Sequence, residues 1–153
     1  MIITSTPKAK IKILNFFYSI CTFFLNFNPT NVGLNFLLFI FLPVSSNIPT
    51  TAFCMELLHP LIRLGPTVRL TKEYVADQIG PNAFENSSNF RLSEWLASQE
   101  DNHRIVLYQC DPEITVWTKL CLRHADVVFM LADPKDDNGV KPLERELEVY
   151  ACS

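Results

Sequence analysis

The chain has 153 residues, which is enough for one domain with a buried core, and its formal net charge is -3. This charge gives no electrostatic reason to expect a nucleic-acid partner, and we predict none. The five cysteines are odd in number and include no Cys-x-x-Cys pair. Reduced thiols are therefore expected, and a disulfide framework is not.

The first 35 residues differ in composition from the rest of the chain. They carry three lysines, Lys8, Lys10 and Lys12, ahead of an apolar run from Ile13 to Leu25. This run is shorter than the roughly 20 residues that cross a bilayer, and no A-x-A-like cleavage site follows it. Phe, Ile, Asn and Lys also have A/T-rich codons. Residues 1–35 are therefore open to three interpretations: a membrane segment, a signal peptide, or non-coding sequence translated through a gene-model artefact.

An α/β domain is predicted over residues 36–153. Its first element is the apolar run 36–42, stopped by Pro43, which we interpret as a strand; the alternative is that it continues the preceding hydrophobic segment. Thr50 and Thr51 are candidate caps for the helix that follows. Pro60 should kink that helix or end it early. The apolar residues of this helix are Phe53, Leu57, Leu58, Leu61 and Ile62.

Two glycine-proline pairs divide the next part of the chain. After Gly65-Pro66, Val68 and Leu70 suggest a short strand. Thr71 is placed to cap a helix that runs to about Ile79 and stops at Gly80-Pro81.

A further helix is predicted over Arg91 to Gln99. Its inward face should carry three apolar residues, Leu92, Trp95 and Leu96, and its outward face three acids, Glu94, Glu100 and Asp101.

The central unit of the domain is Arg104 to Leu131. An apolar strand ends at Asp111-Pro112, Thr115 can cap a helix, and a second apolar run follows Asp126. A strand, a helix and a strand within about thirty residues form a βαβ crossover with parallel strands. Both runs are apolar throughout, so both faces of the sheet should be covered. The helix should pack through Val116, Leu120 and Ala125.

The end of the chain is predicted to be an acidic loop and a final helix. The loop covers 132–141, and the helix starts at Pro142 and packs through Leu143, Leu147 and Tyr150. The order β-α-β-α-α-β-α-β-α describes an α/β fold with a Rossmann-like doubly wound, mostly parallel sheet. This sheet ends before its natural edge, so we expect it to be truncated at the C-terminal side.

The first βα turn is where such a fold normally holds phosphate. Here the turn from Pro43 to Thr51 has no glycine and no lysine, so a Walker loop is excluded. The hydroxyls of Ser45, Ser46, Thr50 and Thr51 can donate hydrogen bonds to an anion, although helix capping explains these residues more simply.

No other constellation indicates a site. His59, His103 and His124 do not fall at metal-ligand spacing with Cys110 and Cys121. A Cys110–His124 pair or a Ser-His-Asp triad stays open as an alternative. The tryptophans, Trp95 and Trp117, are expected in the core. We predict no catalytic, cofactor-binding or metal-binding residues and no cofactor.

Several segments together resemble one known family. Arg91–Cys110 and Trp117–Asp126 are similar to the neuropathy target esterase / Swiss cheese lysophospholipases. Leu42–Ser45, Ala52–Leu57 and Gly65–Thr71 fit the same family in the same order. The resemblance covers most of the predicted α/β domain.

The resemblance implies a region that lies between cyclic-nucleotide-binding-like domains and a patatin-like catalytic domain. The family is membrane-associated on the cytosolic face of the endoplasmic reticulum and hydrolyses lysophosphatidylcholine with a Ser-Asp dyad. That dyad lies in Gly-x-Ser-x-Gly and Asp-Gly-Ala/Gly motifs, which this chain lacks. No catalytic residue is therefore carried over. The chain also departs from the family over 133–141, where an Asp- and Lys-rich loop replaces a Gly-rich run.

We therefore expect a fragment that is not catalytic alone and whose partner is the patatin-like domain of the complete protein. Its contact surface would be the sheet edge after Leu131 together with the final helix. Two alternatives stay open. One is a small α/β module that binds an anionic ligand at Ser45 to Thr51. The other is a membrane-anchored adaptor whose anchor is 13–42.

Overall fold

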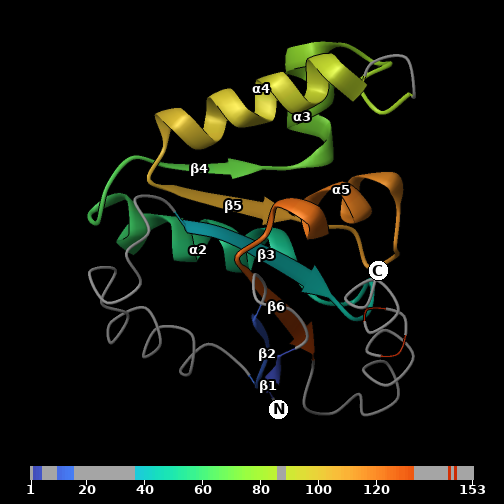
Figure 1. Cartoon of the computed structure of the whole chain (residues 1–153). Coiled ribbons are helices and arrows are strands. Elements are labelled where there is room, and N and C mark those ends of the chain that lie inside the picture. Colours follow the sequence, from blue (N-terminus) through green and yellow to red (C-terminus); the bar gives the residue numbers. More distant parts are fainter. Residues whose placement is uncertain are drawn as a thin grey trace.

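The structure of the chain is a computed structural model. It describes residues 2–4, 10–15, 37–85 and 89–132, together with residues 145 and 147. In this part of the chain, helices cover both faces of one six-stranded sheet (Figure 1). The α/β fold class is confirmed.

The strands are arranged in the order β1-β2-β6-β3-β5-β4. All neighbouring pairs are parallel except β1 and β2, which are antiparallel. Within residues 36–153, the third strand, β5, therefore lies next to the first, β3. In the Rossmann order 3-2-1-4-5-6, the first strand lies between the second and the fourth. The strand bounds are Ile2–Thr4 (β1), Lys10–Asn15 (β2), Leu37–Pro43 (β3), Thr67–Leu70 (β4), Ile105–Gln109 (β5) and Val127–Ala132 (β6).

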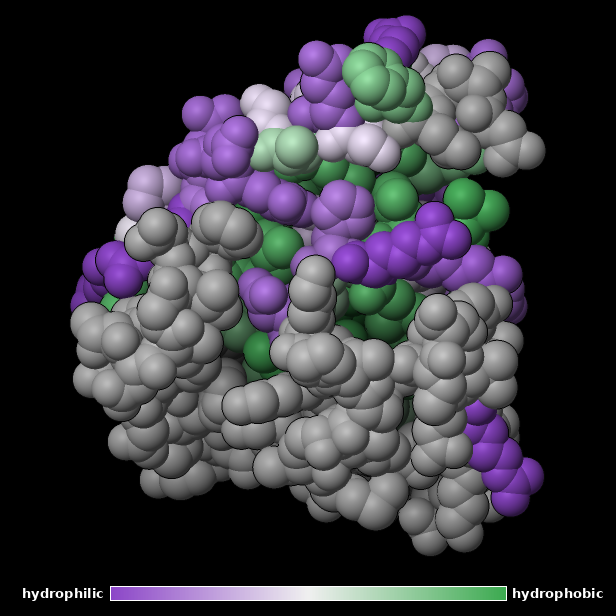
Figure 2. Space-filling view, viewed as in Figure 1, coloured by the Kyte–Doolittle hydropathy of each residue, from purple (hydrophilic) through white to green (hydrophobic). Residues whose placement is uncertain are grey.

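The helices divide unequally between the two faces of the sheet. The phenylalanine-rich face is covered by α2, while α3, α4 and α5 pack on the opposite face. The outer surface of the α3–α4 layer is mostly hydrophilic in the view of Figure 2. The helix bounds are Thr50–Ile62 (α2), Lys72–Ile79 (α3), Asn89–Asn102 (α4) and Val116–His124 (α5).

The central strand is β3, and all seven of its residues are buried. It pairs with β5 on one side and with β6 on the other. On the α2 side, the ring of Phe41 stacks on Phe129 with centroids 5.2 Å apart and contacts Phe53 at 5.5 Å. The strand prediction for 36–42 is confirmed. These residues do not continue the preceding hydrophobic segment, and an anchor over 13–42 would require unpairing the centre of the sheet.

The sheet edge at β6 differs from the expectation. A sheet truncated as predicted would leave β6 as an unpaired edge strand. Instead, Lys10–Asn15 pairs with β6 in parallel, from Lys10 opposite Val127 to Asn15 opposite Ala132. The pairing segment reads Lys-Ile-Lys-Ile-Leu-Asn, whose β-branched residues favour a strand. The predicted contact surface after Leu131 is therefore occupied by β2. The rest of residues 1–35, apart from β1, lies outside the described residues.

The predicted βαβ unit is confirmed, with one correction to its helix. β5, α5 and β6 follow one another as expected, and β3 lies between the two strands. Val116 does not pack inward, since 62% of its surface is exposed. Leu120 and Ala125 pack against the core as predicted. The buried residues within α5 are Trp117, Thr118 and Cys121, because the i, i+4 stripe that faces the sheet begins one residue after Val116.

Two of the predicted helix caps are confirmed and one is wrong. The hydroxyl oxygens of Thr71 and Thr115 accept hydrogen bonds from the backbone N–H groups of Tyr74 and Thr118, at 3.1 and 3.3 Å. For α2 the N-cap residue is Pro49, without a side-chain hydrogen bond, because the helix begins at Thr50 itself. This helix also continues for two residues after Pro60.

The end of the chain is described only in part. Arg145 and Leu147 are helical, and Leu147 is buried in the core on the α3–α5 side. The predicted loop over 133–141 and the rest of the final helix lie outside the described residues. Among the helices that are described, none has both the length and the apolar character needed to cross a membrane.

Candidate functional site

A pocket of about 590 Å³ lies at the carboxyl ends of β3 and β5. It is formed where the connection after β3 leads to α2 on one face and the connection after β5 leads to α5 on the other. In open α/β sheets this switch point is the usual ligand site. The lining residues are Pro43, Ser45, Ser46, Ile48, Pro49, Thr50, Thr51, Ala52, Gln109, Cys110, Asp111 and Pro112.

The predicted anion-binding turn therefore does line a pocket, but several of its donors are absent or already engaged. Pro43, Pro49 and Pro112 have no backbone N–H to offer. The hydroxyl of Thr50 donates to the carbonyl oxygen of Ile48 at 3.2 Å, so it is already committed. A phosphate cradle requires convergent N–H groups and a cation.

Side-chain charge at the pocket also disfavours an anion. Asp111 contributes a carboxylate, which accepts a long hydrogen bond of 3.4 Å from the hydroxyl of Thr115. The guanidinium of Arg69 on β4 is engaged with a residue that lines the pocket, since its Nη1 donates to Gln109 Oε1 at 2.6 Å.

Gln109 ties the pocket wall together. Its Nε2 donates to the hydroxyl of Thr51 at 2.8 Å, which connects the first turn of α2 to the end of β5. Its backbone carbonyl accepts from Trp117 Nε1 at 2.9 Å. Trp117 is buried as expected, and Trp95 is half-buried against the same core. The amide of Gln109 therefore links β4, β5 and α2 at the wall of the pocket.

The buried thiols of Cys121 and Cys54 are poor nucleophiles. Burial is the largest cause that raises the pKa of Cys121, and a hydrogen bond with Cys110 raises it further. Burial likewise raises the pKa of Cys54 to about 12. A thiol with a raised pKa stays protonated at neutral pH, and the thiolate is the reactive form.

The proposed Cys110–His124 pair is not formed. His124 instead contacts Glu100, with 2.9 Å between Nδ1 and Oε1, while Cys110 lies at the pocket and bonds with Cys121. His59 and His103 each bond a backbone carbonyl within their own helix or at its end, those of Met55 and Gln99. Among the described residues, no group of three or more His, Cys, Asp or Glu side chains is placed to hold a metal.

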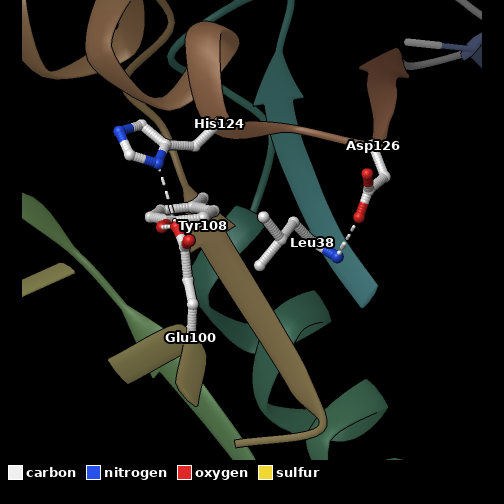
Figure 3. A network of polar contacts seen from close by, with 5 residues as sticks. All are labelled: Leu38, Glu100, Tyr108, His124 and Asp126. Carbon is white, nitrogen blue, oxygen red and sulfur yellow. Dashed lines mark hydrogen bonds and ion pairs between the residues drawn. The ribbon is translucent and has the colours of Figure 1, made fainter. Parts of the chain in front are cut away.

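A polar cluster of Glu100, Tyr108 and His124 joins α4, β5 and α5, and none of these residues lines the pocket. The hydroxyl of Tyr108 donates to Glu100 Oε1 at 2.9 Å, and the same oxygen takes the contact from His124 (Figure 3). The side chains of His124 and Glu100 are only 25% and 18% exposed. The prediction that Glu100 faces outward is therefore wrong.

The electrostatics of this cluster favour the Glu100 carboxylate. Burial alone would raise the pKa of Glu100, but the hydrogen bonds from His124 and Tyr108 outweigh burial and lower the pKa below its ordinary value. Burial and the adjacent Glu100 charge both raise the pKa of Tyr108, so this phenol stays protonated and acts as a donor. A buried tyrosine requires a partner for its hydroxyl, and this was the sequence signal for the cluster.

Asp126 hydrogen-bonds to the central strand β3 near its amino-terminal end, opposite the end that borders the pocket. Its Oδ2 accepts from the backbone N–H of Leu38 at 3.0 Å, and its own N–H donates to the Leu38 carbonyl at 3.0 Å (Figure 3). Asp126 thus serves both backbone groups of Leu38 at the start of β3. Burial is the largest cause that shifts the pKa of this carboxyl, and the net effect is to raise it.

We predict that Glu100→Ala lowers the free energy of unfolding by about 1–3 kcal/mol, since the buried Tyr108 hydroxyl loses its acceptor. Urea unfolding followed by tryptophan fluorescence measures this. In a cycle with Tyr108→Phe, the double variant should be more stable than the sum of the single changes implies. Additive losses would contradict the coupling.

The same cluster should respond to pH with a defined sign. The pKa of Glu100 is lowered in the fold, so its stabilisation is fully present above the ordinary value of 4.5 and is lost as pH falls below it. The stability difference between the wild type and Glu100→Gln should therefore be largest near neutral pH and shrink in acid. A difference that grows in acid would contradict this assignment.

For Asp126, two variants separate the hydrogen bond from the charge. Asp126→Ala should cost about 1–3 kcal/mol, because the N–H of Leu38 loses its acceptor. Asp126→Asn keeps an acceptor oxygen and removes a charge that burial disfavours. Because the pKa is raised, the stability contributed by the protonated acid is lost as pH rises, so at pH 7 the asparagine variant should be at least as stable as the wild type. Equal losses for both variants, in the same urea unfolding, would contradict this.

Comparison with known proteins identifies the family. The model of the neuropathy target esterase family P-loop like domain matches residues 35–152. Proteins named neuropathy target esterase sws match over 109 residues, or 71% of this chain: 42% identical in Drosophila erecta, 43% in Drosophila mojavensis and 41% in Drosophila melanogaster. The matched part is 7%, 7% and 8% of those relatives, respectively. No solved structure matches the chain. The chain thus belongs to the neuropathy target esterase family, whose P-loop like domain it contains.

Proposed function

We propose that this chain is the non-catalytic α/β domain that precedes the patatin-like domain of a lysophospholipase. In the complete protein, which would hydrolyse lysophosphatidylcholine on the cytosolic face of the endoplasmic reticulum membrane, the domain would position or regulate the catalytic domain. The family membership supports this, as does the name of the relatives, of which the chain spans less than a tenth.

The observation that carries the proposal is the character of the pocket. A P-loop binds phosphate through glycines and a lysine, but the corresponding turn here contains prolines, and Asp111 follows the adjacent strand β5. The chain also contains no Gly-x-Ser-x-Gly segment for nucleophilic attack on an ester. What the domain offers instead is a fixed shape, because side-chain hydrogen bonds cross-link its helices and strands.

The proposal predicts that the transcript from this locus continues in frame after Ser153 into a Gly-x-Ser-x-Gly segment. Sequencing the message in both directions measures this. The recombinant 153-residue chain should release no fatty acid from lysophosphatidylcholine, whereas the longer product should. If the message stops at Ser153, the proposal fails, and a binding or regulatory role of the isolated domain replaces it.

A small module that binds an anionic ligand is the second candidate, because the pocket occupies the usual ligand position. The scarcity of free donors predicts that neither inorganic phosphate nor Mg-ATP gives saturable binding in the millimolar range. Isothermal titration at low and high salt tests this. A saturable, salt-sensitive signal that Asp111→Asn strengthens would favour this candidate instead.

A further inference from the structure

Exposed aliphatic and basic side chains lie together at the amino-terminal end of the parallel sheet. α2 ends at Ile62, and Arg63 and Leu64 lead into the turn before β4. Ile62 is 54% exposed, Leu64 is 51% exposed, and Arg63 lies between them and is also exposed. This turn lies at the opposite end of the strands from the pocket (Figure 1). We call Ile62, Arg63, Leu64 and Arg104 the basic-apolar tip.

Arg104 belongs to the tip through direct contacts. Its Nη1 donates to the carbonyl oxygen of Leu64 at 3.3 Å. A Cβ on Gly65 would lie 2.8 Å from Arg104 Cδ, so the aliphatic part of this arginine packs along the glycine. Its backbone N–H donates to the Pro66 carbonyl at 2.8 Å. These contacts hold Arg104 beside the turn that carries the exposed Arg63.

The tip is anchored to the core rather than loosely attached. Leu61, the residue before the tip, is 1% exposed, and its carbonyl accepts from the N–H of Leu64 at 2.9 Å. The hydroxyl of Thr67 donates to the Gly65 carbonyl at 2.9 Å. The exposed positions of Ile62 and Leu64 are therefore fixed by the backbone on both sides.

Both charged members of the tip, Arg63 and Arg104, are basic. The exposed residues next to it along the chain, His59, Pro60 and Pro66, carry no negative charge. The nearest acids in sequence are Glu56, almost two helical turns before Ile62, and Asp101 at the end of α4. Single exposed aliphatic residues are ordinary on protein surfaces, but two beside two arginines form a recognisable combination.

We propose that the basic-apolar tip docks on the surface of an anionic lipid bilayer. The side chains of Ile62 and Leu64 enter the boundary between headgroups and acyl chains, while the guanidinium groups of Arg63 and Arg104 contact the anionic headgroups. A bilayer fits better than a protein partner, because two aliphatic side chains are far too small for a stable protein interface, which buries about 800 Å² per partner. The inference rests on the proposed membrane location and specifies which surface of the domain faces the lipid.

The test is sedimentation of the full 153-residue chain with vesicles of phosphatidylcholine, with and without phosphatidylserine. We expect binding that requires phosphatidylserine and weakens with salt. Arg63→Gln should lower the partition coefficient about fivefold, which corresponds to about 1 kcal/mol for one basic residue near an anionic surface. The double change Ile62→Asp with Leu64→Asp should lower it more than tenfold, roughly the loss of two such contacts. Phe90→Asp, at a 79% exposed residue on α4, is the matched control and should bind like the wild type.

A second measurement locates the contact and separates the tip from the apolar run 13–25, which every variant retains. In Leu64→Trp, the emission of the new tryptophan should shift to the blue when phosphatidylserine vesicles are added. In Phe90→Trp, no such shift should occur. Circular dichroism checks that each variant is folded before comparison.

Several outcomes would overturn the proposal. These are no binding by the wild type, equal binding to both kinds of vesicle, or tip variants that bind as the wild type does. If sedimentation velocity instead shows a dimer that the tip variants dissociate, the occupant of the tip is a second copy of the chain. The proposed domain assignment is judged separately by the transcript, so either result can fail while the other stands.

Discussion

The arrangement of the domain depends on a central strand that has no face open to solvent. The residues of β3 are buried on both sides, between β5 and β6 in the sheet and between α2 and the other helices across it. Fully burying one phenylalanine or leucine side chain contributes about 1.5–3 kcal/mol, and β3 supplies several such residues. A strand of this kind requires helices on both faces, so the crossovers must use both faces of the sheet. The switch point at its carboxyl end follows from that requirement.

Burial of this strand also requires hydrogen-bond partners within the protein, because polar groups at the ends of the sheet lose their contact with water. Asp126 serves the backbone of Leu38 at one end, and the carbonyl of Gln109 receives the indole of Trp117 at the other. Glu100 serves the hydroxyl of Tyr108 where α4 crosses the sheet. In the part of the chain that the structure describes, no buried side-chain nitrogen or oxygen lacks a hydrogen-bond partner. Satisfied polar groups of this kind fix one packing arrangement rather than several.

Local signals made much of the fold predictable from the sequence. The glycine-proline breaks, the apolar runs and the caps at Thr71 and Thr115 act within a few residues, so they specify helix and strand positions without tertiary information. The predictions that were wrong concern features that depend on residues far apart in the sequence. Glu100 was assigned to the solvent because its partners are 8 and 24 residues away. The pairing of β2 with β6 spans most of the chain, and hydrophobic periodicity carries no information about strand order.

The pocket shows why this fold does not by itself specify a ligand. Topology places the turn after β3 beside the end of β5, and this follows from the burial of β3 whatever residues the turn contains. Phosphate binding, in contrast, depends on free N–H groups and a cation at that turn. Three of the lining residues are prolines and have no N–H group, and Arg69 is already hydrogen-bonded to Gln109. The same amide that engages Arg69 also holds Thr51 at the start of α2, so the groups that a ligand would use are spent on joining β4, β5 and α2. A domain built in this way presents a rigid surface, because these hydrogen bonds fix its helices and strands relative to one another.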